Sequence, residues 1–285
     1  MSGTAPAPIG LTGGGSKTTL TCELLTPIEL AQVVKYMRDD NYWMQDKRDG
    51  HRRMVRKASD GLIVGVNRRG LTVPLPARLY AELDTVALET FVIDGEIEGD
   101  RLVVFDLLEA DGDLSSIPYA ARFDRLLQEL SHARVAPESL QYVMPVPTWR
   151  TRAEKETGLQ HLYDTKAEGV VFKRRDAPYA AGRSGSHLKF KFTATCSARV
   201  RKLNQKRSVG LELLDESGNW IAIGNVSVSV RHDKPSVGSL VEVRYLYATS
   251  GQHLYQPVYL GIRDDIREQD CAVSQLKFKK DQGEA

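Results

Sequence analysis

Two stretches of the chain have apolar residues at helical spacing. They are Leu30, Val33, Val34 and Met37, and then Phe123, Leu126, Leu127 and Leu130. The segment Thr26-Pro27-Ile28-Glu29 precedes the first stretch with the order of a capping box and proline at the first helical position. The pattern predicts one helix beginning at Thr26 and another beginning near Pro118.

Apolar residues elsewhere in the first two thirds of the chain form short runs typical of strands. The runs span residues 52–57, 62–66, 91–97 and 102–108. Asp60-Gly61 separates the first two runs, and Glu98-Gly99-Asp100 joins the last two as a hairpin. We therefore expect antiparallel sheets with helices, an α+β fold.

Beyond Phe192 the chain changes to a succession of short strands with turn residues between them. The predicted strands cover residues 198–203, 210–214, 220–223, 240–247 and 256–262. This number and spacing of strands is typical of a small β-barrel such as an OB-fold. A β-sandwich has the same pattern, and strand spacing does not separate the two.

The N-terminal residues 1–20 are rich in Gly, Ser, Thr, Ala and Pro and contain few large apolar groups, so we expect this segment to be flexible. Its Gly13-Gly14-Gly15-Ser16-Lys17-Thr18 run is not a P-loop, because Ser16 stands where that motif needs glycine.

Composition indicates a soluble intracellular protein rather than a membrane or secreted one. The sequence has no long apolar stretch and no secretory signal, and its three cysteines are too few and too scattered for a disulfide framework or a cysteine zinc site. We expect a cytoplasmic protein that does not bind membranes.

The net charge is only +2, but the basic residues are unevenly distributed. Residues 189–207 contain no acidic residue and these basic ones: Lys189, Lys191, Arg199, Arg201, Lys202, Lys206 and Arg207. Such a run suits phosphate groups of nucleic acid, although a solvated basic face gives the same pattern.

Lys47-Arg48-Asp49-Gly50, followed by Arg52, fits the pattern Lys-x-Asp-Gly-x-Arg, in which lysine attacks the α-phosphate of a nucleotide. Four residues recur by chance, so an ordinary lysine at a turn after a strand is the competing interpretation. Further segments appear in order along the chain: Asn67-Arg68-Arg69-Gly70, Asp94-Gly95-Glu96 with Phe105-Asp106-Leu107-Leu108, Glu168-Gly169-Val170-Val171-Phe172-Lys173, and Lys189-Phe190-Lys191.

In this order the segments resemble the motifs of the covalent nucleotidyltransferases: ATP-dependent DNA ligases, RNA ligases and mRNA capping enzymes. The resemblance implies a two-domain nucleotidyltransferase fold, ATP-grasp-like antiparallel sheets with helices followed by an OB-fold. We expect an adenylation domain over residues 21–192 and an OB-fold domain over 193–285.

The resemblance also implies roles at the nucleotide. Lys47 is the nucleophile, and Lys173, Lys189 and Lys191 face the α-phosphate, where charge builds in the transition state. It also implies Gln45 at the adenine edge, Phe105 stacked on adenine, Glu96 on the ribose and near the metal, and Glu168 on the metal. A surface carboxylate at a hairpin is the alternative for Glu96, and a core position is the alternative for Phe105. Arg52 is assigned to the nucleotide and, with Arg68, to the phosphates of the strand ends. From the basic run, we expect Arg199, Arg201 and Lys202 to contact nucleic acid.

The last motif of the family is where this sequence departs from the pattern. Arg263-Asp264-Asp265-Ile266 resembles the segment Arg-x-Asp-Lys, which orients the pyrophosphate, but Ile266 stands in place of the lysine. Arg263 and Asp265 carry over, and Arg267 is a candidate for the missing cation.

The function implied is an ATP-dependent DNA ligase of prokaryotic or viral (phage) origin, which uses ATP with Mg²⁺ or Mn²⁺ and acts as a monomer on nicked double-stranded DNA. An RNA ligase and a capping guanylyltransferase remain alternatives, because the Gln45 amide both donates and accepts and does not exclude guanine. A non-enzymatic nucleic-acid-binding module, which needs only the basic residues, is the alternative from another class.

Overall fold

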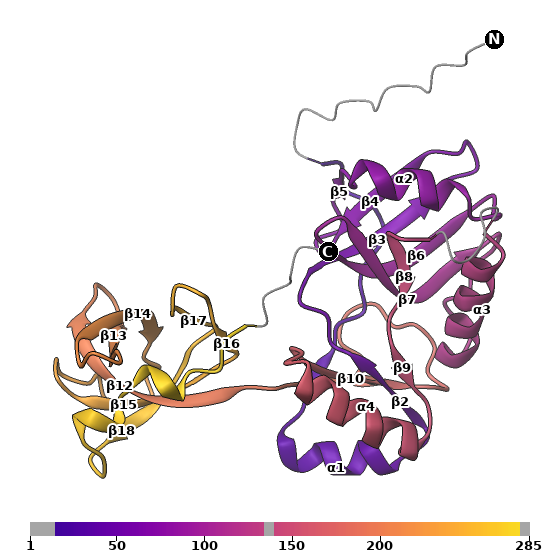
Figure 1. Ribbon diagram of the computed structural model, residues 1–285. Helices are drawn as coiled ribbons and strands as arrows, with labels where there is room; N and C mark the ends of the chain where they lie inside the picture. Colours follow the sequence, from indigo (N-terminus) through magenta and orange to yellow (C-terminus); the bar gives the residue numbers. More distant parts are fainter. Residues whose placement is uncertain (1–14, 134–139, 280–285) are drawn as a thin grey trace. The chain divides into compact units, whose positions relative to one another are not determined.

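The computed structural model describes residues 15–133 and 140–279, and the chain divides into two compact units (Figure 1). The first unit comprises Met1–Gln160 and Gly169–Phe190, and the second comprises His161–Glu168 and Lys191–Ala285. Of the segment predicted to be flexible, residues 1–14 lie outside the described residues. Its remainder forms backbone hydrogen bonds, such as that from Thr18 N to Gly70 O.

The larger sheet of the first unit has six strands in the order β5-β4-β3-β6-β7-β8. These are β3 (His51–Lys57), β4 (Ile63–Asn67), β5 (Thr72–Val73), β6 (Phe91–Glu98), β7 (Arg101–Ala110) and β8 (Val143–Pro145). All neighbours are antiparallel except β7 and β8. The two hairpins predicted from the sequence, β3–β4 and β6–β7, are confirmed.

A second sheet of the same unit has five strands in the order β1-β11-β10-β2-β9. They are β1 (Thr26–Pro27), β2 (Tyr42–Asp46), β9 (Thr148–Trp149), β10 (Gly169–Arg174) and β11 (His187–Lys191). Helices α1 (Leu30–Arg38) and α4 (Arg152–Asp164) lie side by side next to it (Figure 1). Strands β2 and β10 are antiparallel neighbours. Asp46, the residue before Lys47, lies opposite Val170 of β10, and its N–H donates to the carbonyl of Pro147 on the other side.

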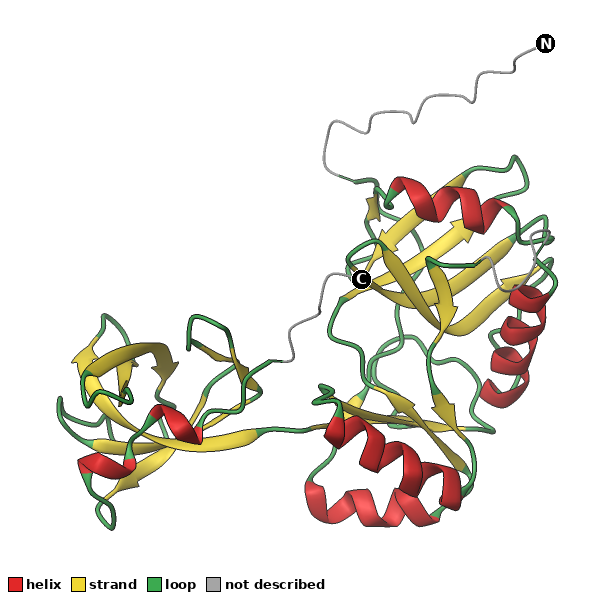
Figure 2. Ribbon diagram, in the orientation of Figure 1, coloured by secondary structure: helices red, strands yellow, loops and turns green. Residues whose placement is uncertain are grey.

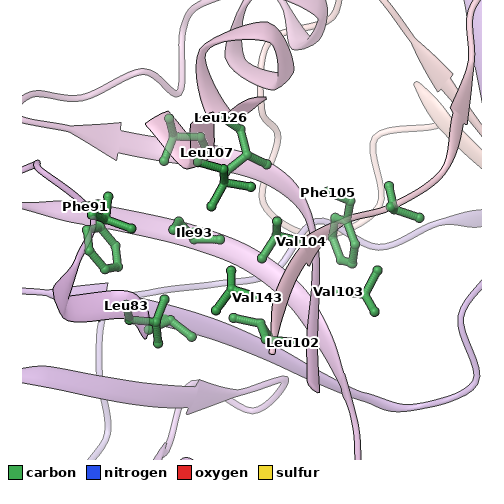
Figure 3. Packing of buried hydrophobic residues seen from close by; sticks show 14 of the residues in the cluster. Leu83, Phe91, Ile93, Leu102, Val103, Val104, Phe105, Leu107, Leu126 and Val143 are labelled. Atoms are coloured by element: carbon green, nitrogen blue, oxygen red, sulfur yellow. The ribbon is translucent and has the colours of Figure 1, made fainter. Parts of the chain in front are cut away.

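Helices α2 (Ala77–Asp84) and α3 (Tyr119–Ser131) pack against the six-stranded sheet, and α3 lies on β7. Of the apolar set predicted for α3, Phe123, Leu126 and Leu130 are buried in the core cluster. Figure 3 shows Leu126 in this cluster with Ile93 and Leu107. Helix α3 begins directly after Pro118, as the sequence predicted. The core thus fixes the strands that carry the candidate site residues.

Most of the regular secondary structure in the second unit is strand (Figure 2). Its elements are β12 (Ala194–Leu203), β13 (Ser208–Leu214), β14 (Trp220–Ser227), β15 (Leu240–Tyr245), β16 (Tyr247–Ala248), β17 (Leu254–Tyr255), β18 (Val258–Arg263) and the short helices η2 (Glu268–Asp270) and η3 (Val273–Gln275). The sheet order β14-β13-β12-β15-β18 is that of an OB-like fold, and among the described residues its edge strands β14 and β18 form no ladder with each other. The predicted strand 240–247 is interrupted at Leu246, after which β16 pairs with β17.

The first predicted helix begins later than expected. Thr26 and Pro27 form β1 and pair in parallel with Leu188 and Lys189 of β11, so this backbone stays extended. Glu29 is then the N-cap and forms a capping box with Gln32. The capping-box signal was correct in kind but wrong in position, because strand pairing by Thr26 and Pro27 excludes them from the helix.

A buried lysine ties α1 to α4 and β2. The side chain of Lys155 is fully buried, and its Nζ donates hydrogen bonds to the carbonyls of Tyr36, Asp39 and Tyr42 at 2.8–3.0 Å. Burial lowers the pKa of Lys155, while Asp40 and Asp39 act in the opposite direction. The ammonium satisfies carbonyls around the C-terminal end of α1, where a cation also interacts favourably with the helix dipole.

We expect Lys155→Met to reduce the free energy of unfolding by about 1–3 kcal/mol, because it leaves buried carbonyls without a donor. Denaturant unfolding followed by tryptophan fluorescence measures the change. The matched control is Lys35→Met at an exposed position of α1, which should change stability by less than about 0.5 kcal/mol. Equal stability of the two variants would contradict this role of Lys155.

Candidate active site

Both sheets of the first unit contribute to one pocket. The lining residues are Leu25, Gln45, Asp46, Lys47, Arg48, Arg52, Glu96, Phe105, Val146, Val171 and Lys173. Strands β2 and β10 supply one side, and β3, β6 and β7 supply the other. The pocket therefore brings together these residues chosen from sequence: Gln45, Lys47, Arg52, Glu96, Phe105 and Lys173.

Lys47 follows the last residue of β2 and is fixed through its backbone. Its N–H donates to the carbonyl of Gly169, the first residue of β10, at 3.1 Å. Its Nζ lies 3.3 Å from the carbonyl of Arg48. The lysine is thus anchored at the end of the central strand pair, with its side chain at the pocket.

Glu98 at the end of β6 holds the loop after Lys47. Its carboxylate accepts hydrogen bonds from Arg48 Nε at 3.0 Å and from the backbone N–H of Asp49 at 3.1 Å. Arg48 also pairs with Asp46 at 2.7 Å. Sequence reasoning missed Glu98, since it treated Glu98-Gly99-Asp100 only as a turn.

Gly50 is required by a close approach to β6. A Cβ at this position would lie 2.3 Å from the carbonyl oxygen of Ile97 and within 3 Å of the Glu96 and Glu98 side chains. The Gly50 N–H points to Glu96 Oε1 at 3.3 Å. The glycine of the Lys-x-Asp-Gly pattern therefore allows the loop to lie against the strand that carries both carboxylates.

Phe105 is contacted by two cations. The Arg52 guanidinium lies 4.6 Å from the centre of its ring and Lys173 Nζ lies 5.3 Å from it. Arg52 is itself held by Asp94, with 2.5 Å between Nε and Oδ1. Phe105 is only 8% exposed, and it belongs to the core cluster as well as to the pocket lining. Its stacking on a base stays a prediction.

Lys173 is a buried cation whose counter-charges come from the protein interior. Burial lowers the pKa of its ammonium, and the Asp106 and Glu23 carboxylates act in the opposite direction. Asp106 also pairs with the buried Arg122, with 2.8 Å between Arg122 Nε and Oδ1. A cation held in a dry environment interacts more strongly with an incoming phosphate than one in water.

Glu23 and His187 form a buried pair that sequence reasoning did not find. Glu23 Oε1 accepts a hydrogen bond from Ser184 Oγ at 2.6 Å, and Oε2 lies 3.4 Å from His187 Nε2. Burial raises the pKa of Glu23, whereas burial together with the charge of Lys173 lowers the pKa of His187 well below its usual range. His187 is therefore neutral at pH 7. No sequence motif signalled this pair.

The carboxylates of the pocket would supply only part of the ligand set of a divalent cation. Among the described residues there is no group of three or more His, Cys, Asp or Glu side chains arranged to hold a metal ion. Mg²⁺ is typically bound by one or two carboxylates together with substrate phosphates and water. Glu96 offers one such carboxylate in the pocket.

Other predicted residues lie away from the lining of this pocket. Lys189 is on β11 of the first unit, and its carbonyl accepts a hydrogen bond from Ile28 N. Arg68 is exposed just after β4. Glu168 and Lys191 belong to the second unit, where they form an ion pair at 2.7 Å, and Lys191 also donates to Gln256.

The basic run of the sequence is partly neutralised in the second unit. Arg199 pairs with Glu212 at 2.7 Å and with Glu268 at 3.1 Å, and its guanidinium lies over Trp220. The neighbouring Arg201 and Lys202 are both exposed. A register shift between Val200 and Lys202 interrupts the strand alternation there, so two successive cations face solvent.

In the segment that resembles the last motif, the arginine forms ion pairs with carboxylates of the protein itself. Arg263 forms ion pairs with Asp265 at 2.7 Å and with Glu242 at 2.9 Å, and these carboxylates raise its pKa. Ile266, which replaces the expected lysine, packs against the core of the second unit. Arg267 is exposed, and its role as the substitute cation stays a prediction.

We expect Gly50→Ala to slow the reaction of Lys47 with nucleotide on the order of 100-fold, because the added Cβ forces the loop away from Ile97. Single-turnover labelling of the protein by radiolabelled ATP measures the rate. Gly112→Ala is the matched control, since a Cβ there meets no atom within 4 Å. Unchanged labelling of the Gly50 variant would show that the close approach does not position Lys47.

No protein-family model matches the chain. A curated DNA ligase of Haemophilus influenzae is 25% identical over 173 residues, which are 58% of this chain and 60% of that protein. A solved structure described as a Lig E DNA ligase, from work on DNA binding with a minimal scaffold, has a TM-score of 0.64 at 17% identity and covers 86% of this chain and 100% of its own. Mycobacterial DNA ligase D with ATP has a TM-score of 0.51 at 20% identity and covers 91% of this chain and 98% of its own.

No helix among residues 15–133 and 140–279 is long and apolar enough to cross a membrane. The likeness to these solved structures covers both units of the chain. The chain therefore has the α+β fold of the DNA ligases to which it is similar, antiparallel sheets with helices together with an OB-like unit.

Proposed function

We propose that this protein is an ATP-dependent DNA ligase that seals breaks between a 5′-phosphate and a 3′-hydroxyl in duplex DNA. The observation that carries the proposal is the convergence of motif residues from β2, β3, β6, β7 and β10 on one pocket with Lys47 at its edge. The similarity to a curated DNA ligase supports it. We further propose an adenylation domain over residues 21–192 and an OB-fold domain over 193–285.

The proposed reaction has three displacements at phosphorus. The neutral amine of Lys47 attacks the α-phosphorus of ATP, an N–P bond forms, the bond to pyrophosphate breaks, and the nitrogen loses a proton to solvent. A 5′-phosphate oxygen of the DNA then attacks the same phosphorus and releases the lysine. Finally, the 3′-hydroxyl oxygen attacks the 5′-phosphorus, loses its proton, and displaces AMP.

We propose a separate role for each of these pocket residues in the reaction. Lys173 supplies positive charge to the α-phosphate from a buried position, and Arg52, fixed by Asp94, presents its remaining donors to a phosphate. Phe105 offers an aromatic surface for the base. Glu96 hydrogen-bonds the ribose, and its carboxylate lies on the strand that holds the Lys47 loop.

The proposal assigns the other residues by their motif positions. Lys189 and Lys191 contact the α-phosphate, Arg68 holds a terminal phosphate of the DNA, and Arg263 with Asp265 orients pyrophosphate. Mg²⁺ would offset phosphate charge, with Glu168 and Glu96 as the carboxylates that hold it. We propose that the substrate is nicked duplex DNA and that the protein acts as a monomer.

Labelling tests the proposal directly. Wild-type protein incubated with α-labelled ATP and Mg²⁺ should acquire covalent label, and Lys47→Ala should acquire none, because the variant lacks the amine that the proposal assigns to the attack. Lys35→Ala is the control and should label as the wild type does. A chase with nicked DNA should release the label as AMP with sealed product.

The same experiment separates the alternatives. Release by a nicked RNA duplex but not by nicked DNA would favour an RNA ligase, and label from GTP rather than ATP would favour a capping enzyme. A wild-type protein that binds DNA but never becomes labelled would be a binding module, and the proposal would fail.

The exposed pair Arg201 and Lys202 gives a prediction for DNA binding. We expect the double variant Arg201→Ala with Lys202→Ala to reduce the slope of log affinity against log salt by about 2, one for each lost phosphate contact. Titration of nicked duplex at several salt concentrations measures it. The paired control, Lys35→Ala with Arg38→Ala on α1, should leave the slope unchanged; an equal slope for both pairs would remove Arg201 and Lys202 from the DNA interface.

A further inference from the structure

Gln45 is a buried polar residue in the pocket, and its amide is held by two hydroxyl groups. It lies on β2, opposite Thr148 of β9, and only 2% of it is exposed. Its Nε2 is 2.7 Å from the hydroxyl of Tyr119 and 3.0 Å from the hydroxyl of Thr148. Both hydroxyls come from segments far from Gln45 in the sequence, so only the fold creates this arrangement.

Each hydroxyl has already committed its proton. Tyr119 Oη donates to the backbone carbonyl of Phe105 at 3.0 Å, and Thr148 Oγ1 donates to the backbone carbonyl of Val146 at 3.0 Å. A carbonyl can only accept, so neither hydrogen bond can be reversed. Each hydroxyl therefore presents a lone pair, and not a proton, toward Gln45.

These two lone pairs fix the orientation of the Gln45 amide. Its NH₂ group has two hydrogens, and each finds one hydroxyl oxygen. Rotating the amide by 180° would place Oε1 against two lone pairs and would leave both hydrogen bonds unmade, each loss costing about 1 kcal/mol or more in a buried site. Hydrogen-bond networks of this kind decide the direction of an amide.

Toward the pocket, Gln45 consequently presents its carbonyl oxygen, which can accept a hydrogen bond but cannot donate one. Its Oε1 has no hydrogen-bond donor among the residues that the structure describes, and the residue is part of the pocket lining. Adenine carries an amino donor at position 6, whereas guanine and hypoxanthine carry an oxygen acceptor there. A fixed acceptor at Gln45 matches the amino group of adenine and opposes the position-6 oxygen of guanine and of hypoxanthine.

We propose that Tyr119 and Thr148 are specificity-determining residues, which lock Gln45 as an acceptor and so select a 6-amino purine nucleotide over a 6-oxo purine nucleotide. The proposal rests on the function proposed above and goes further, because it names residues outside the motifs as the source of nucleotide choice. Neither residue needs to touch the nucleotide. They act through Gln45 as positioning residues.

The test compares ATP with ITP, whose base carries an oxygen at position 6 and a proton on N1 and lacks the 2-amino group of guanine. The measured quantity is kcat/KM for covalent labelling of the protein by each α-labelled nucleotide, and its ratio between them. Wild-type protein should prefer ATP by about 10- to 100-fold, the range expected for a buried hydrogen bond replaced by two opposed acceptors.

The double variant Tyr119→Phe with Thr148→Val removes both lone pairs and frees the amide to turn. We expect its ATP to ITP ratio to fall about tenfold or more, with part of the change arising from faster labelling by ITP. A purely structural role would slow labelling by both nucleotides and leave the ratio unchanged. An unchanged ratio in a variant that still labels would therefore overturn the proposal.

Controls separate folding from specificity. Tyr245→Phe removes a hydroxyl in the same setting, since Tyr245 is fully buried, donates to the Gln275 carbonyl and accepts from Lys277 N, yet lies in the second unit. It should keep the wild-type ratio. Thr148→Ser retains the hydroxyl and should also keep it.

Thr148→Val alone provides the test if the loss of Tyr119 unfolds the protein, because Thr148 is only half-buried. It should lower the ratio by a few fold, and no change would count against the proposal. Absence of label from any nucleotide on the wild-type protein would instead refute the proposed function, and the inference would fall with it.

Discussion

The close packing of the Lys47 loop against the end of β6 is the constraint on which the rest of the site depends. Glu96 and Glu98 lie two residues apart on β6 and therefore point to the same face of the strand, where both accept backbone N–H groups of the loop. Gly50 permits this approach because it has no side chain to meet the Ile97 carbonyl. The loop that follows the nucleophile is thus held by a strand some 50 residues away in the sequence.

The two sheets of the first unit are linked through buried hydrogen bonds rather than through apolar contacts alone. Tyr119, at the start of α3, bonds to the carbonyl of Phe105 on β7 and to the side chain of Gln45 on β2. One hydroxyl therefore connects a strand from each sheet at the pocket. Buried polar networks of this kind hold one arrangement, since any other leaves groups unsatisfied.

Charge in the interior is balanced pair by pair. Arg52 is matched by Asp94 and Arg122 by Asp106, each through two hydrogen bonds to a carboxylate. Lys173 forms no such ion pair within residues 15–133 and 140–279, and it interacts over a longer range with Asp106 and Glu23. A buried ammonium with diffuse compensation is well suited to receive a phosphate, because the phosphate supplies the charge that the protein does not place beside it.

The sequence by itself indicated helix α3, the β3–β4 and β6–β7 hairpins and most strands of the second unit, and it selected six of the residues that line the pocket. Hairpin signals at Asp60-Gly61 and Glu98-Gly99 and the periodicity after Pro118 are local properties, set by backbone preferences and by the alternation of apolar side chains. The start of α1 was misplaced, since pairing of Thr26 with β11 is not encoded locally.

Only the tertiary structure decided which charges are free and which polar atoms are fixed. Arg199 belongs to a run without acidic residues in the sequence, yet Glu212 and Glu268 reach it in space. The amide of Gln45 can donate and accept in isolation, and it becomes an acceptor only through Tyr119 and Thr148. Sequence patterns report what a side chain is able to do, whereas its partners, brought together by folding, decide what it does.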